Sequence, residues 1–223
     1  MNDISDFKDR FSRSRLLFDS DFEKLQNAKV LVCGCGGVGG ACIEALARSG
    51  VGQITAVDCD RFEITNQNRQ LGSESVGELK ASVFEKKFSS IKALNLRIDE
   101  NTLKSLDLAS FDVIIDAVDD INAKILLAFN SPKKRLFSSL GTAKRIDPTK
   151  LNHASIWNTY GDAFGAKFRN RLKKAGFKGD FTCVFSSEEA RCKSLGSCMC
   201  VTASAGLLLA SLAIKKIIKK GCK

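Results

Sequence analysis

The sequence contains few of the residues that build linkers, histidine-based catalytic sites and paired-cysteine zinc sites. Among 223 residues there are two prolines, Pro132 and Pro148, so no stiff proline-rich linker divides the chain and we expect one domain. The single histidine, His153, excludes a histidine-rich metal centre and makes Ser-His-Asp or Cys-His catalysis a narrow prospect, so we expect a surface or hydrogen-bonded residue. No two cysteines have C-x-x-C spacing, which argues against a zinc site of the usual kind.

Long hydrophobic runs are also missing. The opening residues, MNDISDFKDR, do not resemble a signal peptide. The longest apolar stretch, Val201 to Ile214, includes Thr and Ser and stops at two lysines, short of the ~20 residues that span a bilayer, so we expect a buried helix. Nine cysteines, an odd number, without a signal peptide favour a reducing environment, and we expect a cytoplasmic protein.

Hydrophobic and basic residues are abundant instead. Hydrophobic residues make up 44% of the sequence, which excludes a disordered or fibrous protein. Lys and Arg number 35 against 25 Asp and Glu, a formal net charge of +10. This balance favours a polyanionic partner, such as a nucleic acid or a nucleotide, without indicating a reaction.

Hydrophobic periodicity predicts alternating strands and helices. Apolar runs predict strands at 28–33, 53–58, 93–98, 111–118, 135–140 and 181–187. Helical spacing predicts helices at 41–50, 77–91, 119–130, 162–176 and 200–220. Residues 142–157, with an Asp147-Pro148 turn signal, are expected to be extended or to form a hairpin. The predicted fold class is α/β: a Rossmann-like, doubly wound, mostly parallel sheet with an antiparallel C-terminal extension.

A glycine-rich turn gives the first indication of a binding site. The sequence GCGGVG at 34–39 fits the G-x-G-x-x-G pattern, follows a predicted strand and opens a predicted helix. Asp58 stands 24 residues after Gly34, at the end of the next predicted strand. Glycines permit the tight turn and the close approach of backbone to phosphate, while the carboxylate accepts hydrogen bonds from ribose. The combination predicts nucleotide binding without specifying the nucleotide.

Charged and polar residues further along the chain favour ATP. They occur in NQNRQ at 66–70, GELK at 77–80 and DAVD at 116–119. An Arg and a Lys at the carboxyl edge of the sheet can neutralise a triphosphate, and a carboxylate from the adjacent strand end can hold Mg²⁺ against it. A nicotinamide enzyme has no need of these residues, so the pattern indicates ATP activation.

On these motifs the chain resembles, over nearly its whole length, the adenylating superfamily that includes the ubiquitin-activating enzymes and the bacterial activators of sulphur-carrier proteins. The resemblance implies that ATP is bound by Gly34, Gly36, Gly37, Gly39, Asp58, Asp60, Asn68, Arg69 and Lys80. It implies catalytic roles for Arg69, Lys80, Asp119 and Arg15, with Asp119 holding Mg²⁺.

The same resemblance implies a homodimer. Members of the superfamily send an N-terminal arginine into the partner subunit's site, for which Arg15 fits best and Arg13 second. Residues 1–26 would then be an N-terminal arm that contributes to the dimer and to the active site, and residues 27–223 a single ATP-binding domain.

Later segments resemble one branch of the superfamily, the tRNA threonylcarbamoyladenosine dehydratases. These segments are RIDPTKL at 145–151, DAFGAKFRNRLKKAG at 162–176, FTCVFSSE at 181–188 and VTASAG at 201–206. The resemblance implies ATP-dependent cyclisation of the threonylcarbamoyl group on the adenosine beside the tRNA anticodon, through an acyl-adenylate with release of pyrophosphate and AMP. The chain departs from the branch between residues 190 and 196, where it is shorter.

Two other functions remain open. One is adenylation of the C-terminal glycine of a ubiquitin-like sulphur carrier, against which the missing C-x-x-C pairs argue. A sulphur-transfer partner is a further candidate. The other function is a non-catalytic nucleotide-binding module, or a nicotinamide-dependent oxidoreductase with the same glycine turn. Calorimetry with ATP and with NAD would discriminate, since Arg69, Lys80 and Asp119 predict a Mg-dependent preference for ATP.

A basic helix is expected to meet tRNA. Lys167, Arg171 and Lys174 fall at i, i+4 and i+7 and so share one face of the predicted helix, with Arg169 and Lys173 nearby. Such a face could contact an RNA backbone, the alternative being a solvated helix surface. The lysines near the C-terminus are expected instead to complement the dipole of the last helix.

The cysteines are expected to be structural. Cys33 and Cys42 fall in a predicted strand and helix, and Cys35 fills the variable position of the glycine turn. The spacing of a zinc template is missing from the later group, which comprises Cys183, Cys192, Cys198 and Cys200. The proposed reaction requires no protein thiol, so neither a metal site nor a sulphur relay is expected there.

Overall fold

A seven-stranded sheet, in the order β3-β2-β1-β4-β5-β7-β6, forms the centre of the molecule. This computed structural model describes residues 8–219. The strands are β1 (Lys29–Cys33), β2 (Gln53–Val57), β3 (Ile91–Leu94), β4 (Val113–Asp116), β5 (Leu136–Ser139), β6 (Leu151–Ser155) and β7 (Thr182–Ser186). The helices are α1 (Ser12–Phe18), α2 (Asp21–Asn27), α3 (Gly37–Ser49), α4 (Lys80–Lys87), α5 (Glu100–Ser105), α6 (Ile121–Asn130), α7 (Ala163–Lys174) and α8 (Met199–Lys219). Single turns of 3-10 helix are η2 (Ile64–Asn66), η3 (Leu108–Ser110), η4 (Pro148–Lys150) and η5 (Ile156–Asn158).

The predicted fold class is confirmed. Strands β1 to β5 and β7 pair in parallel, whereas β6 pairs antiparallel with β7, from Leu151 opposite Ser186 to Ser155 opposite Thr182. The first strand, β1, lies inside the sheet. Strands β2 and β3 follow on one side of it, and β4 then lies on the other side of β1. In such sheets this reversal opens a crevice at the carboxyl ends of the strands, where ligands bind.

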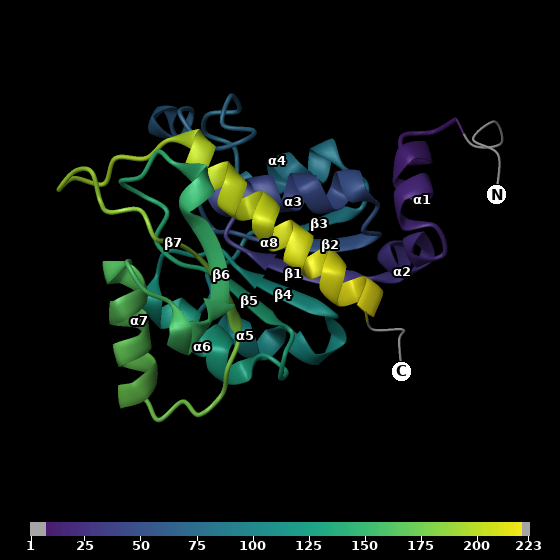
Figure 1. Cartoon of the computed structure of the whole chain (residues 1–223). Helices are drawn as coiled ribbons and strands as arrows, with labels where there is room; N and C mark the ends of the chain where they lie inside the picture. The colour runs from purple at the N-terminus through teal and green to yellow at the C-terminus, as the bar shows by residue number, and fades with distance from the viewer. Residues whose placement is uncertain (1–7, 220–223) are drawn as a thin grey trace.

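Helices cover both faces of the sheet (Figure 1). On one face the core includes side chains from α3, α4 and α8, among them Ile43, Phe84 and Leu209. On the other face it includes side chains from α5, α6 and α7, among them Leu103, Leu127 and Phe168. Because both faces are covered, strands such as β4 are buried at every residue, which explains their unbroken apolar sequences.

Helix α8, Met199–Lys219, agrees with the helix predicted over 200–220 and includes the apolar run 201–214. Its 21 residues make it long and apolar enough to cross a membrane by length and composition alone, a test that core helices also pass. The helix crosses one face of the sheet and packs along α3 (Figure 1). A Cβ at Gly206 would lie 2.2 Å from the carbonyl oxygen of Val38, so this glycine allows the two backbones to touch. The expected buried helix is therefore packed inside the fold.

The segment predicted as an arm contains two helices. Phe22 and Leu25 of α2 are buried, and Leu25 belongs to the same core as α3 and α8. The second half of the segment is thus part of the domain. Helix α5 was not predicted, although Asp99 accepts hydrogen bonds from the amides of Asn101 and Thr102 and caps its start.

Candidate active site

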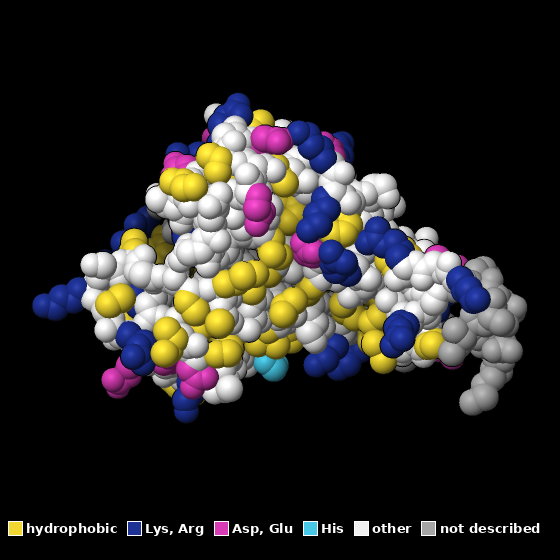
Figure 2. Space-filling model, turned by 90° about the horizontal axis from the view of Figure 1, so that it is seen from above, with side chains coloured by type: hydrophobic (Ala, Val, Ile, Leu, Met, Phe, Trp, Pro, Cys, Tyr) yellow, Lys and Arg dark blue, Asp and Glu magenta, His cyan; other side chains and the backbone are white. Residues whose placement is uncertain are grey.

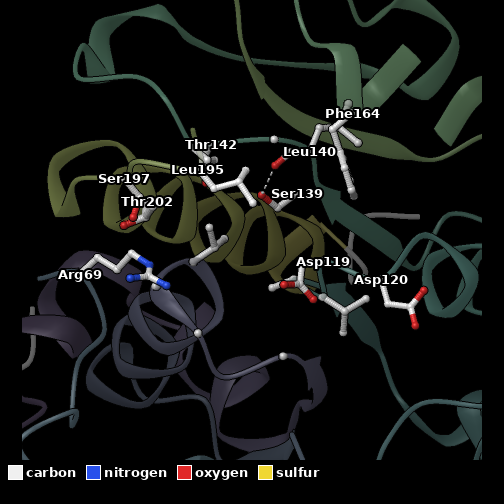
Figure 3. A pocket seen from close by; sticks show the side chains of 18 of the residues that line it. Arg69, Asp119, Asp120, Ser139, Leu140, Thr142, Phe164, Leu195, Ser197 and Thr202 are labelled. Carbon is white, nitrogen blue, oxygen red and sulfur yellow. Dashed lines mark hydrogen bonds between the residues drawn. The ribbon is translucent and has the colours of Figure 1, made fainter. Parts of the chain in front are cut away.

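A cavity of about 870 Å³ lies at the carboxyl ends of β1, β2, β4 and β5. Its lining comes from the glycine turn, the loops after β2, β4 and β5, and the starts of α4, α7 and α8. These segments meet because parallel strands end at the same edge of the sheet. Figure 3 shows Arg69 and Asp119 across the cavity from each other, with Thr142 and Leu195 from later segments beside them.

Three of the four predicted glycines line the cavity: Gly34, Gly36 and Gly37. Gly34 has φ +92°, and a Cβ there would lie 2.6 Å from the carbonyl oxygen of Ala117, so only glycine fits. Helix α3 begins at Gly37, which lines the cavity, and the N-terminus of a helix suits phosphate because its first amides have no partner within the helix. Gly39 lies outside the lining. A Cβ there would lie 1.7 Å from the carbonyl oxygen of Gly34, so we assign this glycine to packing rather than to ATP contact.

A chain of polar contacts links the turn to α4. The Asp58 carboxylate accepts hydrogen bonds from the amides of Cys35 (2.6 Å) and Asp60 (2.8 Å). The Asp60 carboxylate in turn lies 3.1 Å from Nζ of Lys80, whose side chain is 9% exposed against 65% for Asp60. All three charged residues line the cavity. The contacts hold Lys80 against the turn before any ligand arrives.

The NQNRQ segment supplies two cavity residues. Arg69 lines the cavity and donates to the carbonyl oxygen of Thr65 (3.0 Å) and to Oδ1 of Asn68 (2.9 Å). Asn68 lies outside the lining and donates to the carbonyl oxygen of Ser197 (2.9 Å), so it joins this segment to the loop before α8 instead of touching the cavity. Gln70, which had no predicted role, also lines the cavity; among the described residues, none donates a hydrogen bond to its buried Oε1.

Of the two carboxylates directly after β4, one has no hydrogen bond or ion pair with the described residues. Asp119 is exposed, lines the cavity and makes no hydrogen bond or ion pair with residues 8–219. A free carboxylate beside a phosphate site is the donor type that Mg²⁺ takes in proteins, so this residue fits the predicted ion. Asp120 is committed: it caps α6 through the amide of Asn122 (2.8 Å) and pairs with Arg97 (3.2 Å). The amide of Asn122, ahead of the Arg97 contact, lowers the pKa of Asp120.

A buried ion pair below the cavity was not predicted. Nζ of Lys124 lies 3.0 Å from both oxygens of Asp116 and donates to the hydroxyl of Ser138 (3.2 Å) and the carbonyl oxygen of Ser139 (2.7 Å). The two charged side chains are 1% and 0% exposed. A lysine in an otherwise apolar helical pattern, eight residues after an aspartate that ends a strand, was the available signal.

The loop before α8 closes the cavity on one side. The amide of Lys144 donates to the carbonyl oxygen of Gly196 (2.7 Å), and its Nζ donates to that of Lys193 (2.6 Å). Leu195 lines the cavity although it is 84% exposed. This loop includes the segment predicted to be shortened, residues 190–196, so any change in its length alters the edge of the site.

The predicted RNA-binding residues lie on α7, which starts at the cavity. Lys167, Arg171 and Lys174 are exposed, and Arg171 donates to Oδ1 of Asn122 (2.8 Å). They form one cationic stripe that leads away from the cavity along α7.

Two further cations on α7 differ in their surroundings. Lys173 is exposed and lies 5.9 Å from the ring centroid of Trp157. Arg169 is half-buried and donates to the hydroxyl of Thr159, so it is held inside the fold. We therefore remove Arg169 from the residues available to RNA.

The N-terminal arginines lie far from this chain's own cavity. Helix α1 is at the opposite end of α8 from the start that lines the cavity (Figure 1). Arg15 forms an ion pair with Asp9 at 2.6 Å, and this hydrogen bond lowers the pKa of Asp9 to about 2. Arg13 is exposed. Only a second subunit could receive either arginine, and that role stays a prediction.

Four of the cysteines that were expected to be structural are buried. Burial raises the pKa of the thiols of Cys33, Cys35, Cys42 and Cys183. A buried, protonated thiol suits neither nucleophilic attack nor metal binding. Within residues 8–219, one group has metal-ligating spacing, Asp58 with Cys59 and Asp60, and two of its carboxylates already hold the contacts described above.

Comparison with known proteins identifies the class. Residues 11–223 match the ThiF family, so the chain belongs to this family.

Within the family, relatives that match most of this chain are tRNA threonylcarbamoyladenosine dehydratases. The chain is 38% identical over 190 residues to the tRNA threonylcarbamoyladenosine dehydratase of Bacillus subtilis, covering 80% of this chain and 75% of that relative. It is 31% identical to the protein of that name from Haemophilus influenzae, covering 97% and 96%. The crystal structure of Escherichia coli tRNA N6-threonylcarbamoyladenosine dehydratase in complex with AMP has a TM-score of 0.89 at 30% identity and covers 96% of each chain.

Proposed function

We propose that this protein is an ATP-dependent enzyme that cyclises N6-threonylcarbamoyladenosine in tRNA by dehydration. The observation that carries the proposal is the joint placement of Arg69, Lys80 and Asp119 around a glycine turn in one cavity. A relative of the same fold has been crystallised with ATP, at 31% identity over 95% of this chain. The similarity of the dehydratases along nearly the whole chain supports the choice of substrate.

The proposed reaction has two steps. In the first, a carboxylate oxygen of the threonyl group attacks the α-phosphorus of ATP, the bond to the bridging oxygen breaks, and pyrophosphate leaves. In the second, the carbamoyl group of the same nucleoside attacks the activated carbonyl carbon, loses a proton and expels AMP. The oxygen atom lost from the substrate leaves in AMP, so the nucleoside becomes lighter by one water. Holding the two groups of one substrate together makes the second step intramolecular.

We assign roles to the cavity residues according to their positions. The turn from Gly34 to Gly37 and the start of α3 would bind phosphates, and Asp58 would accept from the ribose. Arg69 and Lys80 would stabilise negative charge that builds on the phosphates during attack. Asp119 would hold Mg²⁺, which when bound neutralises phosphate charge.

Exposed cationic and hydrophobic side chains support two proposed partners, tRNA and a second copy of this chain. The exposed stripe of Lys167, Arg171 and Lys174, with Lys173, would bind the backbone of tRNA while the modified nucleoside enters the cavity. We also propose a cytoplasmic homodimer in which Arg15 of one subunit reaches the cavity of the other. Hydrophobic side chains gathered over the middle of one face (Figure 2) agree with an interface between copies. A sulphur-transfer partner stays a candidate without a site assigned to it.

Mass analysis of nucleosides tests the activity. Purified protein with ATP, Mg²⁺ and tRNA that carries threonylcarbamoyladenosine should yield a nucleoside lighter by one water together with AMP. Unmodified tRNA is the matched control and should give neither. An unchanged nucleoside mass after long incubation with fresh ATP would remove the proposed function. If ATP–pyrophosphate exchange depended on a small ubiquitin-like carrier and ignored tRNA, sulphur-carrier activation would be favoured, an activity class found among relatives that match about half of this chain.

A further inference from the structure

One wall of the cavity is organised by a buried arginine that the proposed chemistry does not use. The side chain of Arg145 is 5% exposed. Its guanidinium donates to four backbone carbonyl oxygens at 2.9–3.2 Å, those of Gly141, Ala143, Gly161 and Glu188. A planar group with five fixed donors can fill such a set of acceptors, whereas an ammonium cannot.

Asp162 ties the same wall to α7. Its carboxylate lies 3.6 Å from Arg145 and accepts hydrogen bonds from the amides of Gly141 (2.9 Å) and Gly165 (2.8 Å). A Cβ at Gly141 would lie 2.6 Å from Oδ1 of Asp162, so the wall and the helix start fit closely. The wall is therefore fixed relative to the helix that carries the cationic stripe.

This arrangement leaves two hydrogen-bond donors of Thr142 without a partner among the described residues. In a trans peptide the C=O of one residue and the N–H of the next point in opposite directions. Because the carbonyl of Gly141 faces Arg145, the amide of Thr142 points away from the guanidinium. Thr142 lines the cavity, and neither its amide nor its hydroxyl forms a hydrogen bond with the part of the chain that the structure describes. In Figure 3 its side chain lies beside that of Leu195.

We propose that Arg145 is a positioning residue for the acyl side of the site, and that Thr142 is the group through which it acts. The amide and hydroxyl of Thr142 would donate hydrogen bonds to one oxygen of the substrate carboxylate and leave the other free to attack ATP. The same donors then face the carbonyl oxygen, on which negative charge develops while AMP leaves. This inference rests on the proposed function and deepens it, because it assigns the carboxylate a place separate from Arg69 and Lys80.

The test separates the acyl side from the ATP side. In Arg145→Lys the charge opposite Asp162 stays but the four carbonyl contacts cannot all be made, so kcat/KM for modified tRNA should fall by about tenfold or more, with the Kd for ATP within about twofold of wild type. Thr142→Val replaces the hydroxyl by a methyl group of similar size and should lower kcat several-fold, again with unchanged ATP binding. Because this second variant leaves the wall packed, it keeps the test decisive if Arg145→Lys fails to fold.

Arg135→Lys is the matched control. Arg135 also donates to two backbone carbonyl oxygens, those of Ala109 and Phe111, but lies outside the cavity lining. It should lose stability without losing kcat/KM. Wild-type turnover in both cavity variants, or an equal loss of ATP affinity, would overturn the inference while the proposed function stands. A wild-type protein that forms no AMP with modified tRNA would instead remove the proposed function, and this inference with it.

Discussion

A substitution of Lys80 can test the proposed role at the phosphates without unfolding the protein. It is held by Asp60 at the edge of the glycine turn, and its loss removes a cation from the cavity without opening the core. We expect Lys80→Ala to lower ATP-dependent AMP formation by about 10²–10³-fold, the usual effect of removing one charged donor from a transition state. Single-turnover assays with modified tRNA measure this, and circular dichroism checks the fold.

The matched control is Lys86→Ala on the same helix. Lys86 pairs with Glu78 on the surface, outside the cavity lining, so its removal should leave turnover unchanged. If the two variants lose AMP formation equally, Lys80 has no special place at the phosphates.

The buried pair of Lys124 and Asp116 predicts a loss of stability. Lys124→Met leaves a carboxylate with no exposed surface and no counter-charge, which should lower the free energy of unfolding by about 3–5 kcal/mol. Urea unfolding measures this, and the double variant Lys124→Met, Asp116→Leu should recover most of the loss. As a surface comparison, Lys86→Met breaks the exposed pair with Glu78 and should cost at most about 1 kcal/mol. Equal losses from the buried and the surface pair would contradict the burial argument.

At the scale of the element, α7 is the helix through which we propose that the cavity is linked to tRNA. Its first turn is capped by Asp162 at the cavity, and its later turns carry exposed cations at helical spacing. Lys167→Ala with Lys174→Ala should weaken tRNA binding and lower the slope of log K against log salt by about one for each phosphate that a lysine no longer neutralises. Lys215→Ala on the last helix removes an exposed cation outside the stripe and should leave that slope unchanged. A double variant with wild-type affinity would leave the stripe a solvated face.

Strands and helices could be predicted where the pattern of their own residues is sufficient to define them. The strands β1 and β4 and the helix α3 followed from apolar runs and a glycine turn, because burial on both faces leaves little room for polar residues. Helices α1, α2 and α5 have six or seven residues each, too short for a clear period, so their existence depends on caps and on contacts with the rest of the chain.

At the scale of the whole molecule, the proposed dimer can be tested by complementation. Arg15→Ala subunits keep an intact cavity, and Lys80→Ala subunits keep the arginine. Neither variant alone should be active, but a re-associated equal mixture should regain about a quarter of wild-type turnover, since half of the dimers are mixed and each has one complete site. Light scattering establishes the mass of the particle. A mixture that stays inactive although mixed dimers form would show that Arg15 does not act across the interface.

The sequence by itself determined the order of the parallel strands and the longer helices, the glycine turn and the charged residues at strand ends, because these depend on periodicity and on local backbone geometry. Only the tertiary structure decided which of those residues share a cavity. It assigned Gly39 to packing, Asn68 to a loop contact and the half-buried Arg169 to a contact with Thr159. It also joined Arg145 to Asp162 and Lys124 to Asp116, since the folded chain brings these residues together and a buried charge is costly unless it is paired.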